Sequence, residues 1–302
     1  MLIIKNLSKT YENGVKALIN VNLSIDKGMF GLLGPNGAGK SSLMRTIATL
    51  QEADDGQIVF DGKNAFDDPQ TIRRRLGYLP QDFGVYPKIS AFKLLDHMAI
   101  LKGLLNKGER HDQVNALLQQ TNLFEQKNKA VSTFSGGMRQ RFGIAQALLG
   151  DPKLVIVDEP TAGLDPEERN RFHNLLSEIG ESVVVILSTH IVEDVLDLCP
   201  NMAIMAQGSV LLEGKPIELI NELNGKIWRA TIEKAALAEY QANHKVISTH
   251  LFAGQTQIHV LADQSPGAGF EALQPGLEDV YFSTLSRVRG CVKGSAKGAN
   301  HV

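Results

Sequence analysis

The sequence has little cysteine, no excess of positive charge and no long hydrophobic run. Its 302 residues include two cysteines, Cys199 and Cys291. Two thiols make neither a disulfide framework nor a metal-binding cluster, which fits a reducing compartment. The formal net charge is −2, so no overall positive field attracts a polyanion. We therefore expect no nucleic-acid partner.

Segments that would cross a membrane or direct secretion are also missing from the pattern. The strongest apolar runs are LVIV at 154–157 and VVVIL at 183–187, far short of the roughly 20 residues that a membrane helix needs. The first residues, MLIIKNLSKTY, lack the apolar stretch and cleavage site of a secretory signal. We expect a cytoplasmic chain that reaches a membrane only through a partner.

The two apolar runs belong to a strand, helix and strand pattern. Continuous apolar runs of this length are typical of strands buried on both faces of a parallel sheet. Between them, a helix over 166–179 begins with Pro166 and two acidic residues and ends at Gly180, as helix dipoles and caps favour. The composition, 43% hydrophobic and 21% charged, suits one large or two medium α/β domains.

The remaining regions differ from this pattern. Residues 87–150 carry apolar side chains at helical spacing, in AFKLLDHMAILKG and DQVNALLQQTNLF, which predicts a helical insert. Residues 216–286 combine alternating segments, KIWRATI and QTQIHVLAD, with helices near 234–241 and at LEDVYFSTLSRV, which predicts a small appended α+β subdomain. Residues 287–302 contain four basic side chains and no acid. We expect a solvated, disordered tail there rather than an arm for lipid or nucleic acid.

The segment GPNGAGKS at 34–41 is a complete P-loop. An apolar run, MFGLL, precedes it and a helix-compatible stretch follows it, as the phosphate-binding mechanism requires. Glycines let the backbone wrap phosphate oxygens, Lys40 reaches the β- and γ-phosphates, and the hydroxyl of Ser41 can bind Mg²⁺. The expected nucleotide contacts are Gly34, Asn36, Gly37, Ala38, Gly39, Lys40, Ser41 and Ser42.

Two carboxylates follow the apolar run at 154–157, in LVIVDEP. The carboxyl ends of parallel strands are where doubly wound folds bind ligands. We expect Asp158 to hold Mg²⁺ through water, and Glu159 to polarise an attacking water as a general base. A nucleotide kinase would need an acceptor site and an arginine-bearing lid, and neither is identifiable.

A second phosphate-binding pattern, FSGGMRQR, begins at Phe134. Ser135 offers a hydroxyl, while Gly136 and Gly137 allow close approach at a helix N-terminus, where the dipole stabilises negative charge. Together with the P-loop and the DE strand, this segment resembles the ATP-binding cassette (ABC) ATPases over about residues 2–225. In that family the segment, here including Gln140, is the signature motif and binds the γ-phosphate held by the other subunit. Phe134 stands where the family usually has leucine.

The resemblance implies a fold and boundaries. The fold is that of an α/β P-loop NTPase, with a RecA-like parallel core, an antiparallel β subdomain and a helical insert. The ATPase domain would span 1–215 and include the insert at about 87–150. The accessory subdomain would span 216–286, followed by the tail.

Further motifs match the family one by one. Tyr11 matches the aromatic residue that stacks on adenine, although aromatic residues also favour strands for other reasons. Gln81 matches the glutamine that senses Mg²⁺ and the attacking water. The segment AGLD at 162–165 matches the loop that crosses the dimer interface, and Asp165 would also cap the helix that begins at Pro166. His190 matches the histidine that reaches the γ-phosphate. The implied catalytic set is Glu159, His190, Lys40 and Gln81, and the implied Mg²⁺ ligands are Ser41, Gln81 and Asp158.

The resemblance further implies a head-to-tail dimer that sandwiches two ATP molecules. The partner would be a second copy or a paralogous subunit. The segments GLLGPNGAGKSS, GMRQRFGIAQALLGDP, STHIVEDV and LEDVYF resemble ATP-binding subunits of bacterial export-type transporters that work with a separate membrane permease. That permease would dock at 82–98, over Phe83, Val85, Tyr86 and Phe92, which are equally plausible as core residues. The chain would then lie at the inner face of the cell membrane.

Cassette ATPases also act in translation, DNA repair and the regulation of soluble enzymes. Translation factors of the family usually carry two cassettes, whereas one P-loop is present here. The stretch between Ser41 and Ser135 is too short for the long coiled coil of repair proteins and contains no cysteine. A single cassette that acts on a soluble partner therefore stays as the alternative. Lipid, polysaccharide, drug, peptide and ion are all compatible substrates.

Overall fold

A computed structural model describes residues 1–302 except 82, 85, 162 and 296–302, and over 289–295 it describes the backbone alone. The chain divides into two compact units, residues 1–210 and residues from 211 onward. The division lies close to the boundary expected after residue 215. Within the described part of the chain, none of the helices combines the length and hydrophobicity that crossing a bilayer requires.

The central sheet of the first unit follows the strand, helix and strand pattern of the sequence. Its strands are, in spatial order, β9 (Asn201–Ala206), β3 (Gly28–Leu33), β8 (Val184–Thr189), β7 (Leu154–Asp158) and β6 (Leu76–Leu79), and the edge strand β10 (Ser209–Gly214), which begins in this unit and continues past residue 210, precedes β9 in that order. The pairs from β9 through β6 are parallel. β7 and β8 are buried along their whole length, because the sheet is covered on both faces. The predicted parallel core is confirmed.

This strand order brings the predicted motifs to one edge of the sheet. Leu33 at the end of β3 is paired with Thr189, and Asp158 at the end of β7 is paired with Ser188. Leu79 at the end of β6 lies beside Val157. The chain leaves these adjacent strand ends as the P-loop, the segment with Glu159, the segment with His190 and the segment with Gln81.

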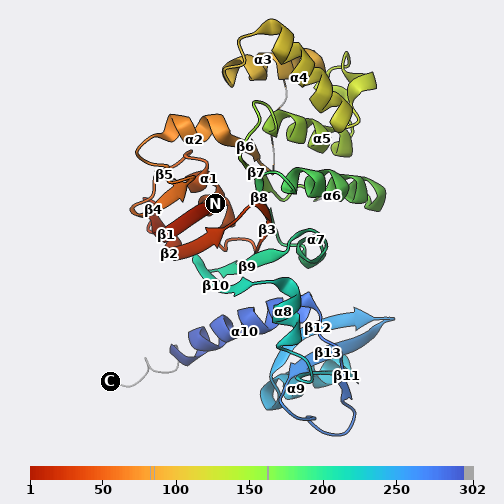
Figure 1. Ribbon diagram of the computed structural model, residues 1–302. Coiled ribbons are helices and arrows are strands. Elements are labelled where there is room, and N and C mark those ends of the chain that lie inside the picture. The colour runs from red at the N-terminus through yellow and green to blue at the C-terminus, as the bar shows by residue number, and fades with distance from the viewer. Residues whose placement is uncertain (82, 85, 162, 296–302) are drawn as a thin grey trace. The chain divides into compact units, whose positions relative to one another are not determined.

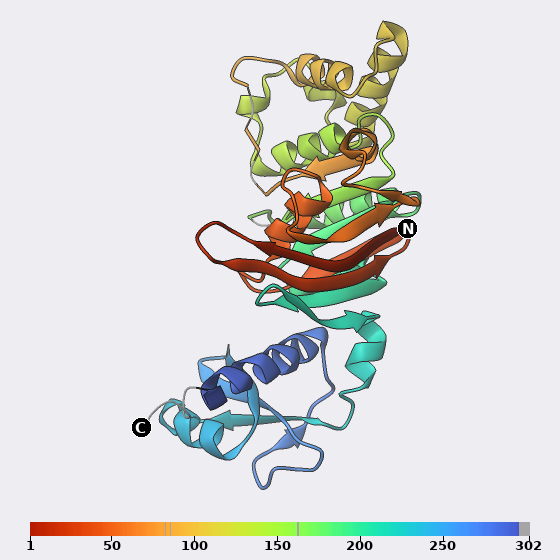
Figure 2. The same cartoon turned by 90° about the vertical axis from the view of Figure 1, so that its left-hand side faces the viewer.

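An antiparallel sheet packs against this core through α1 (Lys40–Ile47). Its strands are β2 (Lys16–Ile25), β1 (Leu2–Thr10), β4 (Asp55–Phe60) and β5 (Lys63–Asn64). β1 and β2 form the long dark-red pair in Figure 2. Both sheets and α1 contribute to one hydrophobic cluster, which includes Ile4, Phe30, Leu43 and Phe60. A short helix, α2 (Pro69–Arg75), precedes β6. The predicted antiparallel subdomain is confirmed.

Residues 91–147 form the predicted helical insert. It consists of α3 (Ala91–Leu101), α4 (Lys107–Gln120), two single turns at Phe124–Gln126 and Val131–Thr133, and α5 (Gly136–Ala147). In Figure 1, α3 and α4 lie together beyond α5. The insert has its own core, in which Leu94, Val114, Leu118 and Phe142 are fully or almost fully buried. α6 (Pro166–Gly180) and α7 (Val192–Leu198) complete the first unit.

The second unit is an α+β subdomain, as predicted. It contains α8 (Pro216–Asn221), β11 (Ile227–Ile232), a turn at Lys234–Ala236, α9 (Leu237–Asn243), β12 (Val246–Phe252), β13 (Gln255–Leu261), β14 (Glu271–Ala272) and α10 (Leu277–Ser295). The sheet order is β12-β13-β11-β14. The sequence analysis did not identify β12.

The C-terminal helix corrects one boundary. α10 is helical to Ser295, whereas the sequence predicted a disordered tail from 287. Leu277, Val280, Tyr281 and Leu285 are buried, so the first half of the helix is anchored by packing. Helix formation is cooperative, so an anchored helix extends into residues that would not begin one. The predicted disorder of 296–302 lies outside the described residues.

Candidate nucleotide-binding and hydrolysis site

The P-loop lies between the end of β3 and the start of α1. Gly39 caps α1 with a φ of +104°, a conformation that side chains disfavour. A Cβ on Gly39 would also lie 2.4 Å from the carbonyl oxygen of Ala17. The first N–H groups of α1 have no helical partner, and they carry the positive end of the dipole. The loop is therefore shaped to receive an anion.

A cavity of about 320 Å³ lies over this loop. Of the predicted site residues, it is lined by Tyr11, Asn36, Gly37, Ala38, Gly39, Lys40, Ser41, Ser42, Gln81 and Glu159. Val15, Lys16 and Ala17 line it from the β1–β2 hairpin. The sequence analysis missed these three residues, because a hairpin that passes over a loop leaves no local motif.

Lys40 is 5% exposed and is held by backbone carbonyl groups. Its Nζ donates a hydrogen bond to the Gly34 oxygen at 2.6 Å and lies 3.8 Å from Glu159 Oε1. Burial lowers the pKa of Lys40, and the charges of Glu159 and Asp158 oppose that shift. Lys40 is therefore a positive charge held beside the P-loop and shielded from solvent.

Glu159 is the meeting point of three motifs. Gln81 Nε2 donates to Glu159 Oε2 at 3.3 Å, while His190 Nδ1 lies 3.2 Å from Oε1. Lys40 approaches the same Oε1. The backbone of Glu159 has a φ of +47°, and its N–H donates to the Ser188 oxygen at 2.8 Å. Left-handed backbone at a non-glycine residue is strained and is often found at functional sites.

Asp158 ends β7 and is 5% exposed. Burial raises the pKa of Asp158, and the nearby Glu159 charge raises it further, while the charge of Lys40 lowers it. A nearby cation would stabilise the charged form of this buried carboxylate. Among the described residues, no group of three or more His, Cys, Asp or Glu side chains could hold a metal alone. A carboxylate oxygen such as that of Asp158 is a ligand type that Mg²⁺ takes, together with waters and substrate phosphates.

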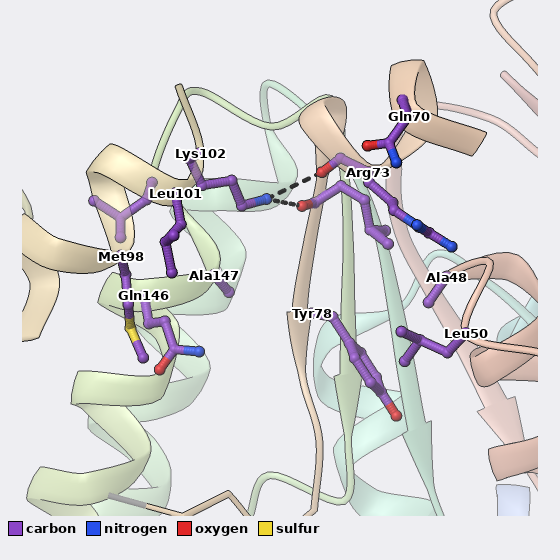
Figure 3. A pocket seen from close by; sticks show the side chains of 12 residues that line it. Ala48, Leu50, Gln70, Arg73, Tyr78, Met98, Leu101, Lys102, Gln146 and Ala147 are labelled. Atoms are coloured by element: carbon purple, nitrogen blue, oxygen red, sulfur yellow. Dashed lines mark hydrogen bonds between the residues drawn. The ribbon is translucent and has the colours of Figure 1, made fainter. Parts of the chain in front are cut away.

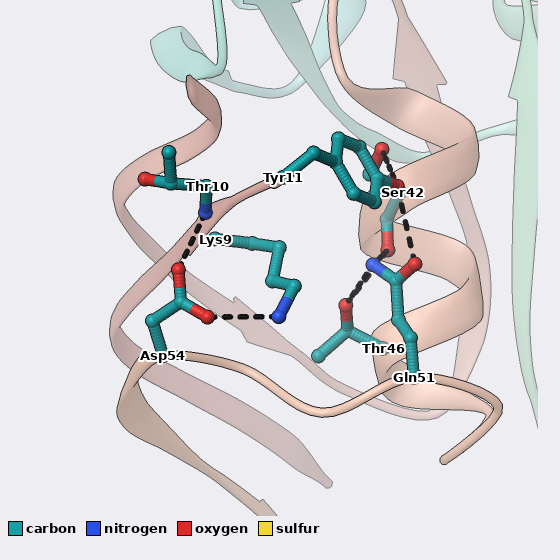
Figure 4. A network of polar contacts seen from close by, with 7 residues as sticks. All are labelled: Lys9, Thr10, Tyr11, Ser42, Thr46, Gln51 and Asp54. Carbon is teal, nitrogen blue, oxygen red and sulfur yellow. Dashed lines mark hydrogen bonds and ion pairs between the residues drawn. The ribbon is translucent and has the colours of Figure 1, made fainter. Parts of the chain in front are cut away.

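Tyr11 lies at the side of the cavity and is fixed by a polar network (Figure 4). Its hydroxyl lies 2.9 Å from Ser42 Oγ and donates to Gln51 Oε1 at 3.1 Å. Gln51 Nε2 in turn donates to Thr46 Oγ1 on α1. The aromatic ring is therefore tied to the helix that follows the P-loop.

The predicted signature segment does not reach this cavity. Ser135 caps α5 and accepts from the Met138 N–H at 3.3 Å, and Gln140 lies half-buried further along that helix. Nothing lies within 4 Å of a Cβ built on Gly136, whereas one on Gly137 would be 2.5 Å from Glu168 Oε2. None of the residues 135–140 is among those that line the P-loop cavity. The open backbone at Gly136 is free for a group from outside this unit.

In the segment after Glu159, Asp165 was predicted to cap the helix that begins at Pro166. The Asp165 side chain accepts from the Glu168 N–H at 2.9 Å and begins α6, which confirms its capping role. Ala162, the first residue of the predicted AGLD loop, lies outside the described residues. Neither Asp165 nor the Asp158 carboxylate lines the P-loop cavity among its described lining residues.

A larger cavity of about 490 Å³ lies between α3 and α5 of the helical insert and the neighbouring part of the core (Figure 3). We call it the insert groove, and it is lined by Ala48, Leu50, Gln70, Arg73, Leu76, Tyr78, Met98, Leu101, Lys102, Gln146, Ala147 and Leu149. Lys102 Nζ donates to the carbonyl oxygens of Arg73 and Leu76 across it. Leu50 and Leu101 are exposed. The sequence analysis missed this groove, whose walls come from four separate segments.

The predicted docking segment 82–98 has several environments. Phe83 and Phe92 pack against the core of the helical insert, which is the alternative that the sequence left open for them. Tyr86 is exposed, and Met98 lines the insert groove. Asp82 and Val85 lie outside the described residues.

The fold and the convergence of these motifs define an ATP-binding cassette, and comparisons with known proteins agree. The family model described as ABC transporter matches residues 18–162. The linearmycin resistance ATP-binding protein LnrL of Bacillus subtilis is 35% identical over 228 residues, 74% of this chain and 72% of that protein. The chain belongs to the ABC transporter family of ATP-binding cassettes and is an ATPase.

Full-length relatives and solved structures extend this result. An uncharacterized ABC transporter ATP-binding protein of B. subtilis, YxlF, is 30% identical over 301 residues, 94% of this chain and 99% of that one. A dimeric bacterial ABC transporter cassette shares 29% identity with a TM-score of 0.65, over 71% of this chain and 98% of its own. A post-hydrolysis state of the same cassette, bound to ADP and Pi, has 28% identity and a TM-score of 0.65.

Proposed function

We propose that this chain dimerises around two ATP molecules and powers a separate membrane permease as the energy-supplying subunit of an exporter. The observation that carries the proposal is the meeting of Lys40, Gln81 and His190 at the Glu159 carboxylate, beside the P-loop cavity. A phosphate-binding lysine and a carboxylate that can take a proton from water are the groups that γ-phosphate hydrolysis needs.

Each residue has a separate role in this proposal. Glu159 accepts the proton of the attacking water. Gln81, which contacts the other oxygen of the Glu159 carboxylate, orients that water. His190 is 47% exposed on its side chain and reaches the γ-phosphate from the solvent side. Lys40 and the N–H groups of α1 hold the phosphates. Ser41, Asp158 and Gln81 would hold Mg²⁺, which would supply positive charge to neutralise the phosphates.

The proposed dimer follows from the separation of the two phosphate-binding segments. Ser135 and Gly136 are exposed and lie outside the P-loop cavity, so this segment would bind the ATP of a partner, with Asp165 near the interface. Dimerisation of a related cassette supports this arrangement. Removal of the γ-phosphate would weaken the sandwich and open it, which converts hydrolysis into motion.

Export is the direction that the resistance protein LnrL supports. Methionine import proteins of Bacillus species are also 34% identical over 232 residues, so the cassette by itself is compatible with either direction. The similarity to YxlF covers nearly the whole length of both chains, which supports our proposal that the accessory subdomain belongs to the transporter subunit. We propose that the chain lies at the cytoplasmic face of the membrane, on its permease.

The insert groove is the surface that we propose for the permease. Leu101 is 76% exposed at its rim, and an apolar side chain of that exposure suits the apolar face of a docking helix. We expect Leu101→Glu to weaken co-purification of the permease more than tenfold, because a buried unpaired charge opposes docking. Leu251→Glu is the matched control, at a leucine 78% exposed on β12. Equal retention of the permease by both variants would contradict this docking surface.

The proposed adenine contact of Tyr11 can be separated from its hydrogen bonds. Base stacking on an aromatic ring contributes about 1–3 kcal/mol, so Tyr11→Ala should raise KM for ATP roughly tenfold or more. Tyr11→Phe keeps the ring and loses the bonds to Ser42 and Gln51, and should stay within about threefold of wild type. Steady-state ATP turnover measures both. A large KM increase in Tyr11→Phe as well would assign Tyr11 to the network instead of adenine.

The whole proposal is tested by identifying what the chain binds in its native cell. A tagged Glu159→Gln variant would be solubilised gently with ATP present, and the co-purifying chains identified. We expect a polytopic membrane protein in stoichiometric yield. Ribosomes, nucleic acid or a soluble enzyme with no membrane protein would overturn the transport task and leave the ATPase intact.

A further inference from the structure

A buried carboxylate behind the site, Asp194, has no role in the proposal above. It lies in the first turn of α7, shortly after His190, and is 0% exposed. Its Oδ1 receives Arg169 Nε at 2.8 Å and lies 2.9 Å from His173 Nε2, both on α6. Its Oδ2 accepts from Thr161 Oγ1 at 2.5 Å. The two oxygens therefore hold different parts of the chain.

The contacts keep this carboxylate charged. Burial alone would raise the pKa of Asp194, but hydrogen bonds from His173 and Thr161 and the charge of Arg169 outweigh burial and hold the pKa below its ordinary range. His173 Nδ1 also lies 3.8 Å from Asp197 Oδ2. A buried charge with several donors is a fixed point, because moving any donor leaves the charge undersatisfied.

Asp194 connects the two segments that carry the proposed catalytic groups. Thr161 follows Glu159 after one proline, and Asp194 follows His190 within about one helical turn. These segments are joined twice: by Glu159 and His190 at 3.2 Å, and by Thr161 and Asp194. The Thr161 carbonyl also accepts from the Leu164 N–H at 3.1 Å. Thr161 thus links the Glu159 segment to the turn that leads into α6.

We propose that Asp194 is a positioning residue for hydrolysis. The Oδ1 atom of Asp194 binds Arg169 and His173 on α6, and its Oδ2 atom binds Thr161. These bonds fix Glu159 against His190, and they fix the start of the loop at 163–165. This inference rests on the proposed roles of Glu159 and His190. Small displacements of a catalytic group can cost large factors in rate, so the hydrogen bond at Thr161 should influence turnover without touching ATP.

The test uses Thr161, because Asp194→Asn would leave Arg169 without its anion and could prevent folding. Thr161→Val is nearly isosteric and removes the donor, and should lower kcat about tenfold or more while KM for ATP stays within about twofold. Thr161→Ser keeps the hydroxyl and should retain kcat within about threefold. Nucleotide affinity and thermal unfolding are measured for both variants.

The outcomes separate this inference from the proposed function. A wild-type kcat in Thr161→Val, or a loss no larger than its loss of folded protein, would overturn the role of Asp194. The same holds if Thr161→Ser loses as much kcat as Thr161→Val. Normal hydrolysis by Glu159→Gln would instead overturn the roles of Glu159 on which the inference rests.

Discussion

Replacing Glu159 with glutamine is expected to lower ATP hydrolysis by about 10²–10⁴-fold, the range that general-base catalysis contributes. The amide has nearly the same shape as the carboxylate, so it can still meet Gln81 and His190, but it takes no proton from water. ATP binding should persist, because the P-loop and Lys40 are unchanged. The variant should therefore accumulate as an ATP-bound dimer, which size exclusion detects.

The matched control is Glu167→Gln on α6. The Glu167 side chain is 77% exposed and pairs with Arg171 on the surface, where a single ion pair contributes little stability. The Glu167→Gln variant should hydrolyse ATP at the wild-type rate and show no trapped dimer. A Glu159→Gln variant that stays monomeric at saturating ATP would contradict the sandwich model, and one that turns over normally would remove Glu159 from the chemistry.

Replacing Lys40 with alanine is expected to abolish nucleotide-dependent activity. Lys40 is the positive charge that is already buried beside the P-loop, with its Nζ 2.6 Å from the Gly34 oxygen. A hydrogen bond between charged groups contributes about 1.5–3 kcal/mol, so ATP affinity should fall roughly ten- to hundredfold. The stabilisation of γ-phosphate charge during hydrolysis is lost in addition. Calorimetric ATP binding and turnover measure the two effects.

A half-buried lysine, Lys102, separates this effect from loss of stability. Lys102 also has a pKa lowered by burial, and it likewise donates to backbone carbonyl oxygens. Lys102→Ala should lower the thermal unfolding temperature as Lys40→Ala does, yet keep wild-type ATP affinity. Normal ATP turnover by Lys40→Ala would contradict the assignment of residues 34–41 as the ATP-binding P-loop.

Much of the candidate site could be predicted from the sequence because phosphate chemistry uses short local segments. The loop at 34–41, the DE pair at 158–159 and the SGG segment at 135–137 each need fixed spacing along the chain. Burial in a parallel sheet likewise left continuous apolar runs at β7 and β8. The helical insert and the accessory subdomain followed from periodicity, with a boundary error at α10.

The contacts that link these segments could not be predicted in this way. Gln81 and Glu159 are 78 positions apart and meet because β6 and β7 are neighbours in the sheet. Phe83 and Phe92 have apolar side chains whether they face a partner or a core, and the structure shows them partly buried against the core of the helical insert. Asp194 lies within the family-like segment STHIVEDV, but the pattern gave it no role, and its contacts appear only when α6 and α7 surround it.

By itself, the sequence determined that this protein has a P-loop, a strand-end carboxylate pair and a Ser-Gly-Gly helix start, since each is a local pattern tied to backbone geometry. Only the tertiary structure decided that Lys40, Gln81 and His190 meet at Glu159, that the signature lies outside the P-loop cavity, and that a groove opens beside the helical insert. These are properties of distances between segments, which depend on strand order and side-chain packing across the whole unit.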